Sequence, residues 1–489
     1  MLPCQQLEWS YLVKGTSEMP DYFQPSSHTY FTPNNDLNED YFLWSISRSM
    51  FTDDKLLPNF TAVQSCLQEP LDYTITATSF TPILPHKATE IDSIFTSMIN
   101  FQDVLKQRQK ENGVIWCDEG VYQVAKEIQL LRPDQFGNIF IALGPFHMEK
   151  IVLSCLGKYL SIIGMDISLK ESGVFGPDVV DSKVMNGGDY VKNKDGFALI
   201  AEVMNSIMFK QFLVEEPATN LQLSDMLYDV SRFVANLDSY DEFKIGWEHC
   251  KTFQKHILDA YEVWKSSSGN ENVQYWAYFI DQVYPIQRDF NHSVRTGDWN
   301  LFVSSVYHSL DLFFACGKTN YSRWAPLFYK DLKDMNRKFP DLHKAFLQKE
   351  FVMYHSERLG SAVGFDMALE KVYNKPAKIK GGMTRRKEAV ALWNLIKHEK
   401  YLFVADLSDL CRLSDNDDEL NYHHDFSNAT TVQGYERFEM LSHTILSIGN
   451  PFARSTRLHN IMSGAEIPQY IVTNALNLLN FGKNVMKSI

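Results

Sequence analysis

The sequence predicts an α/β protein that is predominantly helical, with a small sheet early in the chain and a large all-helical insertion. Residues 113–160 contain two short apolar runs, each bounded by turn residues and each followed by a segment with helical spacing. This alternation indicates parallel strands joined by a crossover helix. Residues 197–351 carry apolar side chains at i, i+3 and i+4 almost throughout, which is typical of packed helices.

The first strand is expected at residues 114–117, followed by a helix that ends before Pro133 and Gly137. A second strand is expected at residues 139–143, and a buried helix at residues 148–160. Asp118 and His147 then both come just after the carboxyl ends of neighbouring strands, where open α/β sheets place their chemistry. The plainer alternatives are that Asp118 caps the next helix and that His147 is a core histidine.

Further elements follow from local patterns. Alternating β-branched residues predict a strand at 71–80, and amphipathic spacing predicts a helix at 91–110. In the helical insertion, apolar stripes predict these helices: 198–213, 223–237, 244–264, 273–294, 299–315, and 324–349 with a break at Pro340.

The chain therefore divides into five parts. They are an irregular N-terminal lead-in at 1–70, the first part of the α/β core at 71–195, the helical insertion at 196–350, a late core helix with a basic segment at 351–400, and a C-terminal tail with short helices at 401–489. The late helix is expected at 365–375. Asp366 and Glu370 lie four residues apart and so share one of its faces.

Charge and composition exclude several classes of protein. The net charge of −13 argues against a protein that coats nucleic acid with its whole surface. Residues 318–400 nevertheless hold 18 Lys and Arg against 9 Asp and Glu, which suits either a solvated helical face or a surface that meets a polyanion. Seven scattered cysteines without a CxxC pair favour reduced thiols inside the cell. The sequence shows neither a signal peptide nor an apolar run long enough for a membrane span.

No common hydrolase, zinc-protease, P-loop or dinucleotide-binding motif is present. The remaining candidates for chemistry are acidic residues at strand ends and on the late helix. Carboxylates from separated segments can hold two divalent cations that drive phosphodiester cleavage, as in RNase H-like nucleases and transposases. We therefore expect an RNase H-like mixed-sheet core with Mg²⁺ as cofactor. Asp118 and Glu370 would be catalytic metal ligands, Asp366 a further ligand, and His147 an assisting residue.

The first acid of such a site is not evident. Asp36, Asp40 and Asp72 precede Asp118 and are the candidates. An exposed helix glutamate is the plainer interpretation of Glu370. His423, His424 and Asp425 lack the spacing of a metal site and are interpreted as surface residues.

DNA contacts are expected from the basic turn and helix start after the late helix. The candidate residues are Lys378, Lys380, Arg385, Arg386 and Lys387. A glycine turn before a helix can hold a phosphate, but GGMTRRK lacks the P-loop spacing.

From about residue 80 to 482 the chain resembles a family of transposable-element-derived proteins found in many copies in cnidarian, fish and arthropod genomes. The resemblance rests on the order of several blocks: ILPHKATEID, CDEGVYQVAKEI, LGPFHMEKI, GVFGPDVVDSKVMNGG, GDWNLFVSSVYHSLDLFFACGKTNYSRW, FDMALEKVYNKPAKIKGGMTRR, HHDFS and NPFARSTRLHNIMSG. It implies DNA strand cleavage and transfer in the nucleus rather than the cytoplasm. Asp118, Gly144, Phe146, His147, Asp366 and Glu370 fall on the family's recurrent positions.

Two departures from the family bear on activity. Relatives carry an upstream acidic block that residues 1–70 lack, and Thr430 and Gln433 stand where relatives are basic. The expected protein is therefore a transposase-like DNA-cleaving enzyme whose activity is impaired or lost. The alternatives are a non-enzymatic scaffold that binds nucleic acid or protein, and a small-molecule enzyme that uses His147 and Cys117.

Overall fold

The computed structural model describes most of the chain. The described residues are 35–50, 57–67, 76, 87–217, 219, 223–225, 228, 230, 232, 240–354, 360–370 and 428–487.

Two short strands form the sheet predicted at residues 113–143. Strands β1 (Gly113–Cys117) and β2 (Ile139–Leu143) pair in parallel, with Gly113 opposite Ile139 and Cys117 opposite Leu143. Helix α4 (Glu119–Leu131) and the single turn α5 (Pro133–Phe136) connect them. The strand–helix–strand prediction is confirmed. Helix α6 (Pro145–Ser161) follows β2 and begins three residues earlier than expected, because Pro145 fits the first turn of a helix.

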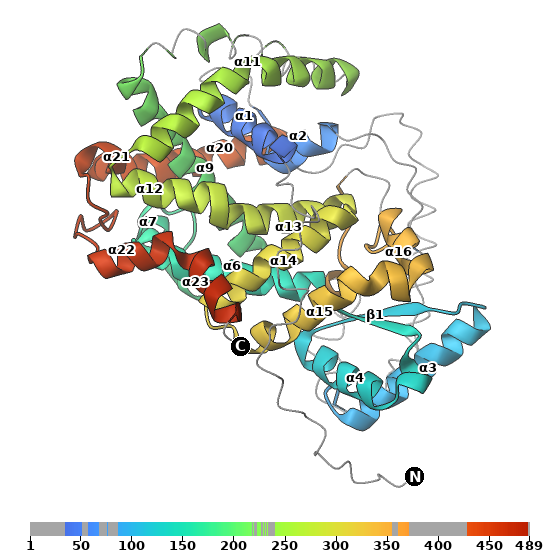
Figure 1. Ribbon diagram of the computed structural model, residues 1–489. Coiled ribbons are helices and arrows are strands. Elements are labelled where there is room, and N and C mark those ends of the chain that lie inside the picture. The colour runs from blue at the N-terminus through green and yellow to red at the C-terminus, as the bar shows by residue number, and fades with distance from the viewer. Residues whose placement is uncertain are drawn as a thin grey trace.

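Helices enclose the sheet. Helix α3 (Ile91–Gln107) packs with α4 on one side, while α15 (Thr319–Lys338) and α16 (Pro340–Leu347) lie on the other (Figure 1). On that second side, Phe140 of β2 contacts the rings of Phe328 and Phe339. All five residues of β2 are therefore buried, as expected of a parallel strand covered on both faces.

The predicted RNase H-like mixed-sheet core is wrong. In the described part of the chain the sheet has two parallel strands, and strand pairing elsewhere is limited to two isolated bridges. The physical reason is that helices pack directly on the two strands and bury their apolar side chains, so burial does not require further strands. Of the strand predicted at 71–80 only Thr76 is described, and it bonds to Tyr354, outside the sheet: Thr76 N–H donates to the carbonyl of Tyr354 at 2.9 Å.

In the helical block after the sheet, the helices predicted at 198–213 and 244–264 are present and longer than expected, while most of the helix predicted at 223–237 lies outside the described residues. The block contains α7 (Met165–Glu171), α8 (Pro177–Val179), the π-helical turn η3 (Val180–Val184), α9 (Tyr190–Glu215), α11 (Tyr240–Ser267), α12 (Glu271–Tyr278), the π-helical turn η4 (Phe279–Val283), α13 (Tyr284–Thr296) and α14 (Trp299–Ala315).

The helix expected at 273–294 is interrupted by η4. Pro285, in the first turn of α13, has no N–H to donate to the preceding turn. A wider π turn directly before it accommodates that loss. Helix α14 matches its predicted range and packs against α6, α13, α15 and the C-terminal helix α23 (Leu478–Lys487). The break at Pro340 is also confirmed, since α16 begins there.

The expectation of an irregular segment at 1–70 is wrong for its described part. Helices α1 (Asn35–Met50) and α2 (Phe60–Leu67) lie there, and α1 packs on α9 and α11. Residues 41–48 of α1 are all buried. A helix enclosed on all sides needs no polar stripe, so it lacks the amphipathic signal by which helices are recognised.

The C-terminal region is more regular than a tail of short helices. It contains the 21-residue helix α20 (Asn428–Ile448), then α21 (Pro451–Arg454), α22 (Gln469–Leu476), and α23. Helix α20 packs on α9, and α22 packs on α12.

Among the described residues, α9 alone is a single helix long and apolar enough to cross a membrane, and α6 with α7 passes the same test as a pair bent by 89°. Of the apolar window in α9, 78% is buried inside the protein. This is the property of a core helix.

Candidate functional site

The carboxyl ends of β1 and β2 meet at one edge of the sheet. Gly144 N–H donates to the carbonyl of Cys117 at 2.7 Å, which joins the ends of the two strands. Asp118 follows β1 and caps α4, accepting the N–H of Val121 on Oδ1 at 2.9 Å. The capping role weighed for Asp118 is therefore present, although its second carboxylate oxygen is not used in this bond.

Asp366 reaches the same edge from a segment more than 200 residues later. It lies in the short helix α17 (Phe365–Ala368) and is buried. Its two oxygens accept the backbone N–H groups of Phe146 at 3.3 Å and His147 at 3.1 Å. These groups belong to the first turn of α6, where a negative charge meets the positive end of the helix dipole. Asp366 thus caps α6 from outside that helix.

Two glycines leave room for this carboxylate. A side chain on Gly144 would overlap Asp366 Oδ2, and one on Gly364 would come within 2.8 Å of Oδ1. Neither glycine has a positive φ. The requirement for glycine at these positions is therefore steric rather than conformational.

His147 links Asp366 to Glu370. Its Nδ1 lies 3.0 Å from Asp366 Oδ2, and its Nε2 lies 3.9 Å from Glu370 Oε2. An ionised carboxylate only accepts hydrogen bonds, so the neutral tautomer with its proton on Nδ1 can donate to Asp366 and leaves the lone pair on Nε2. A carboxylate fixes a histidine in this way in general-base dyads and behind histidine metal ligands.

The surroundings of this edge favour the neutral forms of the Cys117 thiol and the Tyr321 phenol. Burial raises the pKa of the Cys117 thiol, and the charges of Asp118 and Asp366 raise it further. The Tyr321 phenol in α15 has a raised pKa through burial and through Glu119, Asp366 and Asp118. Cys117 is therefore a poor nucleophile at neutral pH, which weakens the expectation of a small-molecule enzyme that uses it.

Glu119 joins the group, although the sequence expectation did not include it. Burial raises the pKa of this carboxyl, while a hydrogen bond from Asn320 at 3.3 Å lowers it. Its Oε1 is buried and has no hydrogen-bond partner among the described residues. The adjacent pair Asp118-Glu119 was the signal in the sequence. We call Asp118, Glu119, His147, Asp366 and Glu370 the strand-end cluster.

Comparison with known protein families identifies the family of the chain. Residues 61–489 match the profile of a family described as a domain of unknown function, DUF8702. The chain belongs to this family. Neither a curated protein nor a solved structure matches it. Within the DUF8702 match fall all members of the strand-end cluster, whereas α1 precedes it.

Two of the three candidates for the first acid, Asp36 and Asp40, are engaged elsewhere in this DUF8702 protein. Asp40 is occupied in α1, where it accepts hydrogen bonds from Trp247 at 2.9 Å and Gln64 at 3.0 Å and pairs with Lys251 at 3.1 Å. Asp36 lies one turn earlier and acts on the same Lys251. Both are structural residues of the α1–α11 contact, and Asp72 lies outside the described residues.

Backbone groups engage two of the expected Mg²⁺ ligands. Asp366 directs both oxygens to the backbone of α6, and Asp118 directs one to α4. Within the residues that the structure describes, no group of three or more His, Cys, Asp or Glu is arranged to hold a metal ion. Mg²⁺ therefore stays a prediction from the sequence, and no chemical step is assigned to a metal.

The other predicted site residues lie outside the described residues. These are the DNA-contact candidates Lys378, Lys380, Arg385, Arg386 and Lys387. The residues His423, His424 and Asp425, interpreted above as surface residues, also lie there. In the described part of the basic zone, Arg337 and Lys338 of α15 pair with Asp334 of the same helix at 3.2 and 3.3 Å. Part of that zone is thus a solvated helical face.

Proposed function

We propose that the strand-end cluster is a phosphodiester-cleaving site that acts on DNA, in a protein of transposable-element origin. The observation that carries the proposal is the contact of His147 with Asp366 at Nδ1 and with Glu370 near Nε2. The sequence resemblance supplies the substrate class. Asp118 and Glu119 supply further carboxyl groups at the same edge of the sheet.

In this proposal His147 acts as the general base. Asp366 fixes the ring so that the lone pair of Nε2 is available, and Nε2 takes the proton from the hydroxyl that attacks phosphorus. Glu370, at 3.9 Å from Nε2, stabilises the imidazolium that forms. The leaving oxygen then recovers a proton from the same ring or from water. General-base catalysis of this kind contributes about 10²–10⁴ in rate.

The test is nicking of supercoiled plasmid DNA by the full-length protein, with and without Mg²⁺ and with EDTA. His147→Gln removes the base and should lower the nicking rate by about 10²-fold or more. Asp118→Asn keeps a good helix cap and removes one charge from the cluster, so it too should lower the rate.

Asp298→Asn is the matched control. Asp298 caps α14 as Asp118 caps α4, accepting the N–H of Leu301 at 2.9 Å, but it lies outside the strand-end cluster. Its variant should nick at the wild-type rate. Equal rates for wild type, His147→Gln and Asp118→Asn would reject the proposal, as would a wild-type protein that does not nick under any of these conditions.

A non-enzymatic scaffold is the second candidate. Asp118 and Asp366 both cap helices, and capping alone accounts for a carboxylate at these positions. In that case the chain binds DNA without cleaving it, and the binding affinity is the same for wild type and His147→Gln.

A further inference from the structure

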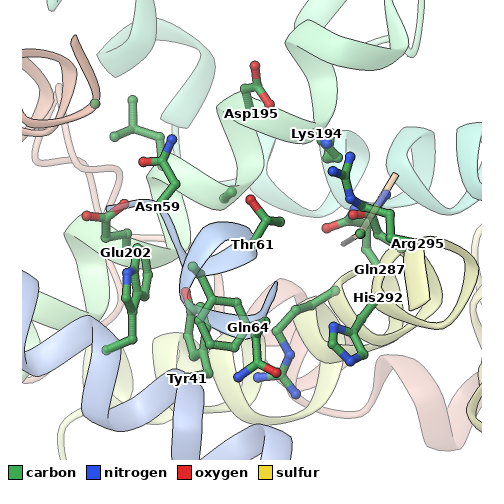
Figure 2. A pocket seen from close by; sticks show the side chains of 18 of the residues that line it. Tyr41, Asn59, Thr61, Gln64, Lys194, Asp195, Glu202, Gln287, His292 and Arg295 are labelled. Carbon is green, nitrogen blue, oxygen red and sulfur yellow. The ribbon is translucent and has the colours of Figure 1, made fainter. Parts of the chain in front are cut away.

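A cavity lies between helices outside the strand-end cluster, and none of the five cluster residues lines it. Its volume is about 490 Å³, within the range of about 300–1,000 Å³ found for small-molecule sites. Helices α1, α9, α13 and α20 contribute most of its lining, together with α2 (Figure 2). Because these elements are distant in sequence, the cavity exists only in the assembled protein.

The lining is basic although the protein as a whole is acidic. Five cationic side chains line the cavity, namely Arg48, Lys194, Arg288, Arg295 and Arg437, against the two carboxylates Asp195 and Glu202. The chain as a whole carries a net charge of −13. A local excess of positive charge in a concave site raises the concentration of anions there. We call this site the basic cavity.

Acidic partners hold Arg48 and Arg288 against the wall. Arg48 pairs with Glu202 at 2.5 Å, and Arg288 pairs with Asp289 at 2.7 Å. Both acids have a raised pKa because they are buried, and the adjacent arginine lowers it in each case. These pairs hold the guanidinium groups of Arg48 and Arg288 in place. Lys194 and Arg295 lie together at another end of the cavity in Figure 2, on α9 and α13.

A buried polar network supports that end. Glu149 of α6 accepts hydrogen bonds from Tyr190 at 2.7 Å and Gln287 at 3.1 Å, and Asn291 donates to the Tyr190 hydroxyl at 3.0 Å. Lys194 acts on Glu149 from the cavity side. The network holds α9 and α13 in place, so the basic groups at this end are positioned before a ligand arrives.

His292 lines the cavity and has a lowered pKa. Burial lowers the pKa of this imidazole to about 3, and Arg288, Arg295 and Lys349 contribute in the same direction. His292 is therefore neutral at pH 7. It offers one donor and one acceptor to a ligand. Amide and hydroxyl groups of the lining, among them Gln64 and Thr61, add further hydrogen-bonding capacity.

We propose that the basic cavity binds a small phosphate-bearing anion of nucleotide size, with Lys194, Arg295 and Arg437 facing the phosphate. Arginine and lysine form charge-assisted hydrogen bonds with phosphate oxygens. The cavity volume suits a mononucleotide, and a polymer would need an open groove in place of a cavity lined by five helices. The proposal is independent of the cleavage proposed for the strand-end cluster.

The test is calorimetric titration of the full-length protein with adenosine monophosphate, inorganic phosphate, adenosine and a single-stranded 20-nucleotide DNA. Adenosine monophosphate should bind, inorganic phosphate should compete with it, and adenosine should bind at least tenfold more weakly, a difference of about 1.4 kcal/mol. Lys194→Met keeps the aliphatic stem and removes the charge. It should weaken adenosine monophosphate about tenfold or more.

Lys192→Met is the matched control, because Lys192 lies on the same helix and does not line the cavity. It should leave the affinity within about twofold, and circular dichroism melts of both variants check that they fold. The proposal is overturned if neither adenosine monophosphate nor phosphate binds, if both lysine variants weaken binding equally, or if adenosine binds as tightly as its monophosphate. Binding of the oligonucleotide alone, weakened by Lys194→Met, would also overturn it, in favour of a polymer.

Discussion

Asp366 contacts both the backbone of α6 and the ring of His147 with one carboxylate. It satisfies two backbone N–H groups at the start of α6 and at the same time holds Nδ1 of His147. A variant that removes this side chain would both leave buried donors without partners and release the ring. Loss of activity in such a variant would not distinguish a catalytic role from a structural one. Substitutions of the surrounding residues are more informative.

Gly144→Ala tests how tightly the Asp366 carboxylate is fitted. The new Cβ would overlap Asp366 Oδ2, so we expect a loss of about 1–3 kcal/mol in the free energy of unfolding, as for overpacked sites. Urea denaturation measures it.

Gly176→Ala is the control for that substitution. Both glycines are N-caps followed by proline, with φ values of −61° and −60°, but a Cβ on Gly176 would meet nothing within 4 Å. Its substitution should be neutral, or stabilising by up to about 1 kcal/mol through the unfolded chain. Equal losses for the two variants would mean that the backbone, and not the carboxylate, sets the requirement for glycine.

At the scale of elements, the packing of α23 on α14 encloses an acid. Asp311 of α14 is buried, and the backbone of Gly482 in α23 lies directly against the Asp311 carbonyl. Burial raises the pKa of Asp311 to about 6, although Lys483 and Lys487 lower it. Asp311 Oδ1 has no hydrogen-bond partner among the described residues.

This acid predicts a pH dependence of stability. The folded protein binds a proton at Asp311 more tightly than the unfolded chain, whose reference pKa is 3.8. The stabilisation is therefore complete below pH 3.8 and is lost as the pH rises from about 4 to 6. We expect Asp311→Asn to be more stable than wild type at pH 7.5 by about 1–3 kcal/mol, and to show a smaller difference at pH 4.5. Urea denaturation at the two pH values measures this, and a gain that is equal at both would contradict it.

Local pattern gave the elements whose signal lies in neighbouring residues. The strands at 114–117 and 139–143, the stop before Pro133 and the range of α14 were all predictable, because short apolar runs and helix breakers act over a few residues. The sheet size was not, because the sequence does not say whether a strand or a helix covers an apolar face. Helix α1 was missed because residues 41–48 are buried on every side of the helix, so the sequence shows no alternation of apolar and polar faces.

In the candidate site too, the features that depend on neighbouring residues were predictable and the long-range contact was not. The positions of Asp118 and His147 were predictable from strand ends. The predicted helix at 365–375 is described only to residue 370, with α17 ending at Ala368, yet Asp366 and Glu370 both lie near His147. That Asp366 turns to the N–H groups of α6 depends on a contact across 219 residues, which no local pattern carries. The three-carboxylate metal centre expected from the sequence stays a prediction.

At the scale of the whole molecule, Arg48 connects four segments. It pairs with Glu202 of α9 at 2.5 Å, donates to the carbonyl of Leu57 at 2.9 Å, and lies over the Tyr435 ring of α20. Helix α1 precedes the DUF8702 match, yet this buried pair makes it part of the core.

Arg48→Ala should therefore cost about 3–5 kcal/mol, because it leaves the Glu202 carboxylate buried without its cation. The double variant Arg48→Met, Glu202→Leu should recover much of that loss, since apolar residues of similar volume can replace a buried pair. Arg108→Ala, at an exposed position after α3, is the control. The free energy of unfolding in urea measures all three. A loss below about 1 kcal/mol for Arg48→Ala would show that the pair is not a structural link.

The distance along the chain between His147 and Asp366 also sets an order of events during synthesis. A ribosome adds about 5–20 residues per second, so His147 leaves it many seconds before Asp366, which follows 219 residues later. Until then the first turn of α6 has no Asp366 to accept its N–H groups, and the imidazole has no carboxylate to orient it. The dyad is therefore assembled only after the helical block has been made, and an incomplete nascent chain carries the histidine without its partner.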